Sequence, residues 1–350
     1  MSRGVWKAGA ARVLCRTGLY KLLASINGAR RLPAVIGYHR IVENFAASLA
    51  TSIPSLLVSC AMFERHVDWL ARRYRIVDLT ELGARLESGE ELPPNLAAIT
   101  FDDGYADFYD HALPILRRKG IPAAVFVMTD FVGTAKIPDH DRLYLLLARR
   151  IGRRALPPWH GIGGPRIDQM TAYQATRTLI ETLPSTAIQQ VISTLEREDE
   201  VPERLLRPIR LLNWEQLRQI REAGMTIGSH TRSHIVLTNE NSARVSEELA
   251  GSRADLESNL SGNIQHFVYP SGLFNAQSVQ QVAAAGYRFA YTGCTHRSAE
   301  YPLLTLPRTI LWENSSLDSE RAFSSSVLTC QVHHAFDFAG GCRQRHALGS

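Results

Sequence analysis

The segment Leu96-Ala97-Ala98-Ile99-Thr100-Phe101-Asp102-Asp103-Gly104-Tyr105 joins an apolar run to two adjacent carboxylates. The run has the length of a buried strand and a helix pattern follows it, so the segment predicts a strand–helix unit. Neighbouring aspartates repel each other. Placing Asp102 and Asp103 together at the end of a strand therefore indicates a bound cation or a divided acid and base role. The alternative is that the pair only caps the following helix.

A second β-prone run, Met225-Thr226-Ile227-Gly228-Ser229, leads into two histidines. His230 and His234 are four residues apart, so both imidazoles can lie on one side of a helical turn and bind a borderline metal such as zinc. A histidine pair on its own is more often a surface or core feature. Its occurrence together with Asp102-Asp103 favours a metal site over that alternative.

The two motifs together resemble a known family. Thr100-Phe101-Asp102-Asp103-Gly104-Tyr105 with Ser229-His230-Thr231-Arg232-Ser233-His234 is similar to the first two motifs of the polysaccharide deacetylases, the NodB-like carbohydrate esterases, and the chain resembles their exopolysaccharide-associated type. A looser resemblance runs from residues 34–40 to 306–308. It implies an α/β fold, namely a distorted (β/α) barrel with about seven parallel strands. It also implies a hydrolase that removes acetyl groups from acetamido sugars in a polysaccharide or envelope glycan.

The resemblance further implies a role for each polar residue of the motifs. Asp103, His230 and His234 are the implied ligands of one divalent metal ion, with Zn²⁺ expected, and Asp102 is the implied general base. Because Asp103 is then bound to the cation, Asp102 can accept a proton from the attacking water without being a ligand itself. A backbone N–H near Tyr105 is expected to help hold the oxyanion.

The third motif departs from the family pattern. Many members carry an arginine ahead of a Pro-Tyr or Pro-Phe pair, but here the corresponding stretch, 266–272, has none. Tyr269 and Pro270 are expected to form part of the pocket wall. Arg308 is the candidate to supply the missing cation near Asp102, and the alternative is a surface arginine.

The general acid is not assigned by the sequence. His333 and His334 lie in a weak tail pattern, and His266 stands at the wrong end of its strand. His39 follows a predicted strand, 34–38, where a barrel delivers side chains to its site face. It is expected to line the pocket or to be a hydrogen-bonded structural histidine.

Three alternative functions can be compared with the sequence. One is deacetylation of a lipid-linked or small acetamido sugar, which the basic N-terminus would suit. Another is a carbohydrate-binding relative that keeps the metal without turnover, although a binder has no need of Asp102. A serine hydrolase using Ser229 or Ser233 is disfavoured, because no histidine and acid pair remains free to activate a serine.

Patterns along the chain predict three regions. Residues 1–32 form a basic and possible amphipathic helix, and residues 33–323 form the barrel, in which strand and helix patterns alternate. A mainly helical insertion is expected over about 134–212. Residues 324–350 are expected to be a poorly ordered tail.

Charge and cysteine usage bound the partners and the compartment. The formal net charge is +5, and residues 1–42 contain basic but no acidic side chains, so the remainder is close to neutral and nucleic acid is not expected as a partner. The N-terminal helix could instead rest on an anionic membrane surface, and the alternative is a solvated helix that packs on the outside of the barrel. We expect no clear signal peptide or membrane span, and five dispersed cysteines are compatible with a reducing compartment, which favours the cytoplasm or the inner membrane face. The sequence leaves the oligomeric state open. The apolar members of the N-terminal pattern are Trp6, Val13, Leu14, Leu22, Leu23 and Ile26.

Overall fold

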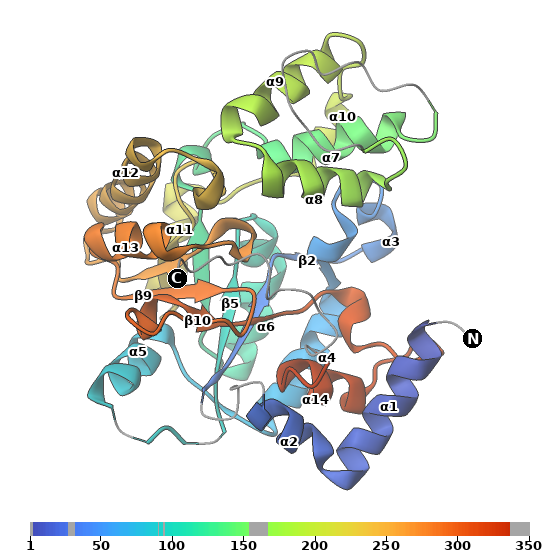
Figure 1. The fold of residues 1–350 in the computed structure, drawn as a ribbon, viewed down its shortest axis with the longest axis vertical. Helices are drawn as coiled ribbons and strands as arrows, with labels where there is room; N and C mark the ends of the chain where they lie inside the picture. Colours follow the sequence, from blue (N-terminus) through green and yellow to red (C-terminus); the bar gives the residue numbers. More distant parts are fainter. Residues whose placement is uncertain (1–2, 27–31, 90, 94, 154–166, 337–350) are drawn as a thin grey trace.

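A twisted, all-parallel sheet wrapped by helices forms the body of the protein (Figure 1). The computed structural model describes residues 3–26, 32–89, 91–93, 95–153 and 167–336. Strands follow the order β10-β9-β8-β7-β6-β5-β1-β11, and β4 pairs with β5 off this path. Their bounds are β1 Ala34–Tyr38, β4 Arg75–Ile76, β5 Leu96–Phe101, β6 Ala124–Val127, β7 Thr226–Ser229, β8 His266–Val268, β9 Phe289–Thr292, β10 Leu306–Pro307 and β11 Thr309–Ile310.

The two ends of the sheet meet at one residue, Arg308. Strand β10 pairs with β9 and strand β11 pairs with β1, yet only Arg308 separates β10 from β11 in the sequence. One extended segment therefore bridges the first and last strands and nearly closes the barrel. The predicted distorted (β/α) barrel is confirmed. Its path has eight strand segments where about seven strands were expected, because the closing strand is interrupted at Arg308.

Side chains of the barrel strands alternate between two apolar clusters, as the pleat requires. Ile99 packs in the larger cluster beneath the surrounding helices, whereas Ala98 belongs to the smaller cluster inside the barrel, together with Phe126 and Tyr291. All six residues of β5 are buried, which is why its sequence is apolar throughout. The surrounding helices are α4 Cys60–Ala71, α5 Leu79–Ser88, α6 Leu113–Lys119, α11 Trp214–Glu222, α12 Ser242–Leu260 and α13 Ala276–Ala284.

Between β6 and α11, in the segment where the sequence predicts a helical insertion, the described residues form four α-helices. They are α7 Asp139–Arg150, α8 Ala172–Thr182, α9 Ser185–Glu196 and α10 Glu203–Leu206. Leu143 and Leu147 of α7, Leu179 of α8 and Val191 of α9 bury one another in a separate apolar cluster. The group stands beyond the end of the sheet in Figure 1. The Gly/Pro-rich stretch at 154–166 lies outside the described residues.

A smaller parallel pair and a short helix lie between β1 and α4. Strands β2 (Arg40–Val42) and β3 (Leu57–Ser59) pair with each other, and α3 (Phe45–Ser48) lies between them in the sequence. Asn44 caps α3 by accepting a hydrogen bond from the backbone N–H of Ala47. These elements lead the chain from the first barrel strand toward the helices on the outside.

The N-terminal and C-terminal segments pack together. The predicted single helix is two helices, α1 (Arg3–Thr17) and α2 (Leu19–Ile26), because Gly18 between them has a φ of 73°. The prediction of a poorly ordered tail from 324 is wrong for residues 324–336, which include α14 (Ser325–Val332). Val327 and Cys330 of α14 are buried against Ala8 and Ala11 of α1. Residues 337–350 lie outside the described part of the chain.

Within the described residues, the structure has no helix of the length and apolarity needed to cross a membrane. Cys15, Cys60, Cys294 and Cys330 form no disulfide bond within the described part of the chain.

Candidate active site

The polar residues singled out by the sequence meet at the carboxyl ends of the barrel strands. Asp102 and Asp103 follow β5 directly, His39 follows β1 and His230 follows β7. Parallel strands deliver such residues to one face of a barrel. Together with Arg308, these four side chains line one cavity of about 390 Å³.

Asp103, His230 and His234 form a group that fits a metal ion. One ligand atom from each lies within 4.8 Å of the others. Oδ1 of Asp103 is 3.4 Å from Nε2 of His230 and 3.5 Å from Nε2 of His234. This buried oxygen has no hydrogen-bond partner among the described residues. A carboxylate oxygen facing two imidazole nitrogens is the donor set that zinc accepts in sites that keep a coordination position open.

Hydrogen bonds orient the first imidazole of this group. Nδ1 of His230 lies 2.8 Å from the carbonyl oxygen of Val268 and donates to it, which leaves Nε2 with its lone pair directed toward Asp103. Burial raises the pKa of Asp103, but the neighbouring imidazoles outweigh that effect, so the pKa lies well below its ordinary value. Asp103 is therefore held as a carboxylate.

The backbone at the group is unusual. Asp103 has a φ of 68° and His234 a φ of 62°, in the left-handed region that side chains other than glycine rarely adopt. Gly104 has a φ of 70°, and a Cβ there would lie 2.8 Å from Cγ1 of Val127. Such conformations persist only where surrounding contacts enforce them. The chain is thus bent to point these ligands inward.

Glu248, on α12, fixes the segment 230–234, which carries both histidines and is called the histidine loop below. This residue was not predicted from the sequence. Its fully buried carboxylate accepts hydrogen bonds from the backbone N–H of Arg232 (2.8 Å) and of Ser233 (2.9 Å), and from the hydroxyl of Ser233 (2.6 Å). The available signal was its position on the mostly apolar face of α12, beside Val245 and Leu249. A charged residue on a buried face indicates a specific partner.

Asp102 is paired with Arg308. Nη1 of Arg308 donates to Oδ1 of Asp102 and Nη2 donates to Oδ2, each over 2.7 Å, while Nη1 also reaches the hydroxyl of Thr100 at 3.0 Å. Burial raises the pKa of Asp102, but the charge and hydrogen bonds of Arg308 lower it below its ordinary value. The cation absent from the third motif is thus supplied by the strand segment that closes the barrel.

His39 lies beside this pair. Its Nε2 is 4.0 Å from Oδ2 of Asp102, and its buried Nδ1 has no hydrogen-bond partner among the described residues. The imidazole lines the cavity, so the first of the two predicted positions for His39 is the observed one.

His140, on α7, also lies at the site. It belongs to none of the motifs found in the sequence. Its Nε2 is 3.9 Å from Oδ2 of Asp103, and its ring centroid is 4.8 Å from that of His234. The hydroxyl of Tyr105 lies 2.9 Å from Nε2 of His140 and donates to Oδ2 of Asp141 over 2.6 Å. The insertion is therefore joined to the end of β5 through buried hydrogen bonds.

Of the three other residues predicted for the site, Tyr105, Tyr269 and Pro270, only Tyr269 lines the cavity. The side chain of Tyr105 is buried and lies outside the cavity lining, so its expected backbone contact with an oxyanion stays a prediction. Tyr269 lines the cavity and donates its hydroxyl hydrogen to the carbonyl oxygen of Leu304 over 3.0 Å. Pro270 is buried at the start of the following turn and lies outside the lining.

One helix of the insertion forms a wall of the same cavity. The cavity-lining residues of α8 recur at helical spacing, so they occupy one face, while Leu179 on another face packs into the core of the insertion. Trp312 lines the cavity from the segment after β11. The lining residues of α8 are Tyr173, Thr176, Arg177, Ile180 and Glu181.

Comparisons with known proteins agree with this geometry. A family model described as polysaccharide deacetylase matches residues 89–290. The chain is 29% identical over 116 residues to the poly-beta-1,6-N-acetyl-D-glucosamine N-deacetylase of Staphylococcus aureus, a match that covers 31% of this chain and 40% of that protein. It therefore spans well under half the length of that curated relative.

Solved structures share the fold. The Streptococcus pyogenes deacetylase PplD, in complex with acetate, superposes with a TM-score of 0.55 at 19% identity and covers 86% of this chain and 97% of that one. IcaB from Ammonifex degensii gives a TM-score of 0.53 at 17% identity and covers 87% and 97%. At these identities the likeness concerns the fold alone.

Proposed function

Because the chain belongs to the polysaccharide deacetylase family, we propose that it catalyses the metal-dependent hydrolytic N-deacetylation of acetamido sugars in a polysaccharide or envelope glycan. The observation that carries the proposal is that a metal-ligand set and an arginine-paired carboxylate line the same cavity. Asp103, His230 and His234 offer a ligand set, and Asp102 stands next to them as a carboxylate paired with Arg308.

We assign the metal ion, with Zn²⁺ as the expected species, to Oδ1 of Asp103 and the Nε2 atoms of His230 and His234. When bound, the ion lowers the pKa of a water molecule and polarises the acetamido carbonyl group. The protein contributes the rigid placement of these three atoms, through the hydrogen bond from His230 to Val268 and the Glu248 contacts to the histidine loop.

Asp102 is the proposed general base. The oxygen of water forms a bond with the acetyl carbon, and Asp102 takes the proton that the water loses. Arg308 keeps this carboxylate ionised and fixes the direction of both its oxygens. The C–N bond then breaks, and the products are acetate and a free amine on the sugar.

His39 is the proposed route for the proton that the departing nitrogen needs. It faces the cavity, and its Nε2 lies 4.0 Å from Oδ2 of Asp102. Once the bound substrate brings the imidazole within hydrogen-bond reach, directly or through one water molecule, a proton held by Asp102 can pass through His39 to the nitrogen as the C–N bond breaks. His140, the other cavity-lining imidazole outside the ligand set, is engaged with Tyr105.

The shape of the cavity favours a glycan chain over a small sugar. An acetamido group occupies only the region between Asp102 and Asp103, whereas the cavity continues along α8 past Tyr173 to Glu181. An aromatic ring can stack on the apolar face of a sugar, and the pair of Arg177 and Glu181 (2.7 Å) can meet its hydroxyl groups. A catalytic role is favoured over simple binding because binding alone does not require a buried, arginine-paired Asp102.

The test is acetate release from oligomers of N-acetylglucosamine, in β-1,4 and β-1,6 linkages, by metal-stripped protein with and without added zinc. The proposal expects zinc-dependent acetate in the wild type and none in His230→Ala. Folding of the variant is checked by circular dichroism. A wild-type protein that takes up one equivalent of zinc and releases no acetate from either series or from envelope glycan fragments would contradict the proposal.

A further inference from the structure

Three large apolar side chains are exposed on the two N-terminal helices. Val13 is 58% exposed, Leu19 46% and Leu22 56%, and among the side chains that the structure describes the only other exposed large apolar one is that of Leu49, at 39%. Single exposed apolar side chains are ordinary, but three within the ten residues 13–22 of two consecutive helices are not. Apolar groups concentrated in this way indicate a surface that is covered by something apolar.

Basic side chains surround these residues. Arg12, Arg16 and Lys21 are exposed, and residues 1–42 contain no acidic side chain. Arg12 has one ion pair, with Asp318, and this pair is weak because the distance is long, at 3.8 Å, and the arginine is exposed. Arg16 and Lys21 have no ion-pair partner in the described part of the chain. Their charges are therefore available to an anionic partner.

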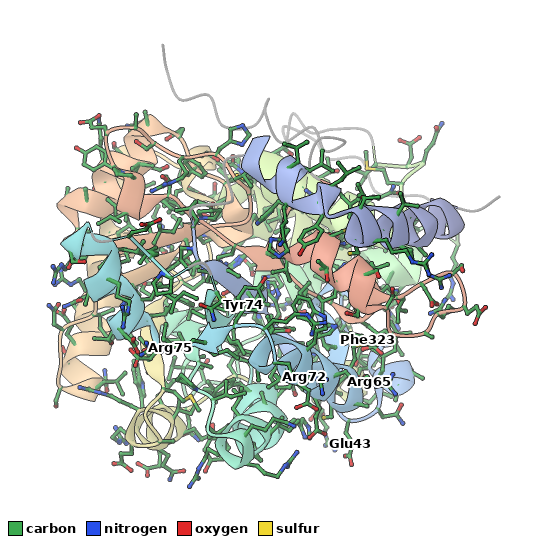
Figure 2. All side chains as sticks on the ribbon, turned by 90° about the horizontal axis from the view of Figure 1, so that it is seen from below. Glu43, Arg65, Arg72, Tyr74, Arg75 and Phe323 are labelled. Carbon is green, nitrogen blue, oxygen red and sulfur yellow. The ribbon has the colours of Figure 1, made fainter. Side chains whose placement is uncertain are left out.

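The opposite faces of the same helices are fixed to the protein. Ala8 and Ala11 of α1 pack against Val327 and Cys330 of α14, and Figure 2 shows α14 beside the two helices. The hydroxyl of Ser325, at the start of α14, accepts a hydrogen bond of 2.9 Å from the indole of Trp69 on α4. The exposed residues consequently form a rigid outer surface rather than a loose arm.

We propose that this surface, formed by Arg12, Val13, Arg16, Leu19, Lys21 and Leu22, docks the protein on an anionic lipid bilayer. Apolar side chains that enter the headgroup boundary, next to cations that meet lipid phosphates, are the combination by which helices lie in a membrane interface. A nucleic acid would use the cations and leave Leu19 and Leu22 exposed. This inference is independent of the proposed enzymatic function.

The test is co-sedimentation of the full chain with lipid vesicles. Vesicles with about 30% phosphatidylglycerol in phosphatidylcholine are expected to bind at least about tenfold more tightly than pure phosphatidylcholine, and added salt is expected to weaken the binding. Leu19→Ser/Leu22→Ser and Arg16→Ala/Lys21→Ala are each expected to weaken binding to the anionic vesicles about tenfold. Thermal unfolding verifies that both double variants remain folded.

Matched controls come from elsewhere on the surface. Leu49→Ser removes the fourth exposed apolar side chain, and Arg218→Ala removes an exposed arginine of α11; both are expected to leave vesicle binding unchanged. Absence of binding to anionic vesicles, or equal losses in the control variants, would overturn the proposal. A dimer in analytical ultracentrifugation that Leu19→Ser/Leu22→Ser converts to a monomer, without vesicle binding, would assign the surface to a second copy instead.

Discussion

Arg308 donates two hydrogen bonds to the carboxylate of Asp102, from Nη1 to Oδ1 and from Nη2 to Oδ2, and both measure 2.7 Å. Both side chains are buried. The barrel closes where Arg308 interrupts its last strand, so the residue that completes the sheet also faces the end of β5. Closure of the fold and orientation of the proposed base thus depend on the same five-residue segment, 306–310.

Arg308→Lys should lower kcat about 10²-fold, because lysine cannot form the bidentate pair and a small misplacement of the base is costly. Since Arg308 lowers the pKa of Asp102, its replacement should raise that pKa and move the acidic limb of the kcat/KM profile to higher pH. The profile is measured with and without the substitution, using Arg218→Lys as the surface control. An unchanged acidic limb would argue against Asp102 as the base.

Asp102→Asn and Asp103→Asn should differ in metal content. The first removes the base while leaving the ligand set, so kcat should fall about 10²- to 10⁴-fold with zinc stoichiometry retained. The second removes a ligand, so zinc and turnover should both be lost. Metal content is measured by inductively coupled plasma mass spectrometry after dialysis. Loss of zinc from Asp102→Asn would assign that residue to the metal instead.

Tyr105→Phe should lower the free energy of unfolding by about 1–3 kcal/mol, because the buried carboxylate of Asp141 loses its hydrogen-bond donor. Denaturant unfolding measures the change. Tyr109→Phe is the matched control, since its hydroxyl bonds to Gln219 at an exposed position and its loss should cost less than about 0.5 kcal/mol. Equal effects of the two substitutions would show that the hydrogen bond from Tyr105 to Asp141 of α7 contributes nothing to stability.

The sequence was informative where a local pattern determines local structure. The apolar run 96–101 predicts a buried parallel strand, and a parallel strand places Asp102 and Asp103 at its carboxyl end without knowledge of the other strands. The same reasoning applies to His230 after 226–229. For these residues the fold follows from hydrophobic burial and the geometry of parallel sheets.

Residues that act through distant partners were harder to predict. His140 reaches Asp103 only because the insertion folds back over the strand ends, and the tail was misjudged because α14 is stabilised by Ala8 and Ala11 at the other end of the chain. Neither contact leaves a periodic signal in its own segment. Arg308 was named as a candidate because the third motif lacks its arginine, and only the closing register of β10 and β11 determines its contact with Asp102.

Tyr173→Ala should reduce the preference for long substrates. If α8 contacts a second sugar, the ratio of kcat/KM for an N-acetylglucosamine pentamer to that for the monomer should fall about threefold to tenfold, mainly through KM. Tyr173→Phe, which keeps the ring, should restore the ratio. Arg142→Ala breaks an ion pair between α7 and Glu196 of α9, away from the cavity. This variant tests whether loosening the insertion alone lowers the ratio. A ratio unchanged in Tyr173→Ala would refute the contact.

Acid should destabilise the protein through His266. Burial inside the barrel lowers the pKa of His266 to about 3, from an ordinary value near 6.5. Between these two values the unfolded chain binds a proton that the folded chain does not, so stability falls as pH decreases from about 6.5 toward 3. At pH 5 this effect lowers the free energy of unfolding by about 2 kcal/mol. Urea unfolding at pH 7.5 and pH 5 measures the decrease in the free energy of unfolding between the two values. This decrease should be about 2 kcal/mol smaller in His266→Gln than in the wild type. In the control His111→Gln, at a partly exposed position, it should equal that of the wild type. Parallel losses in His266→Gln and the wild type would show that His266 is not buried in its neutral form.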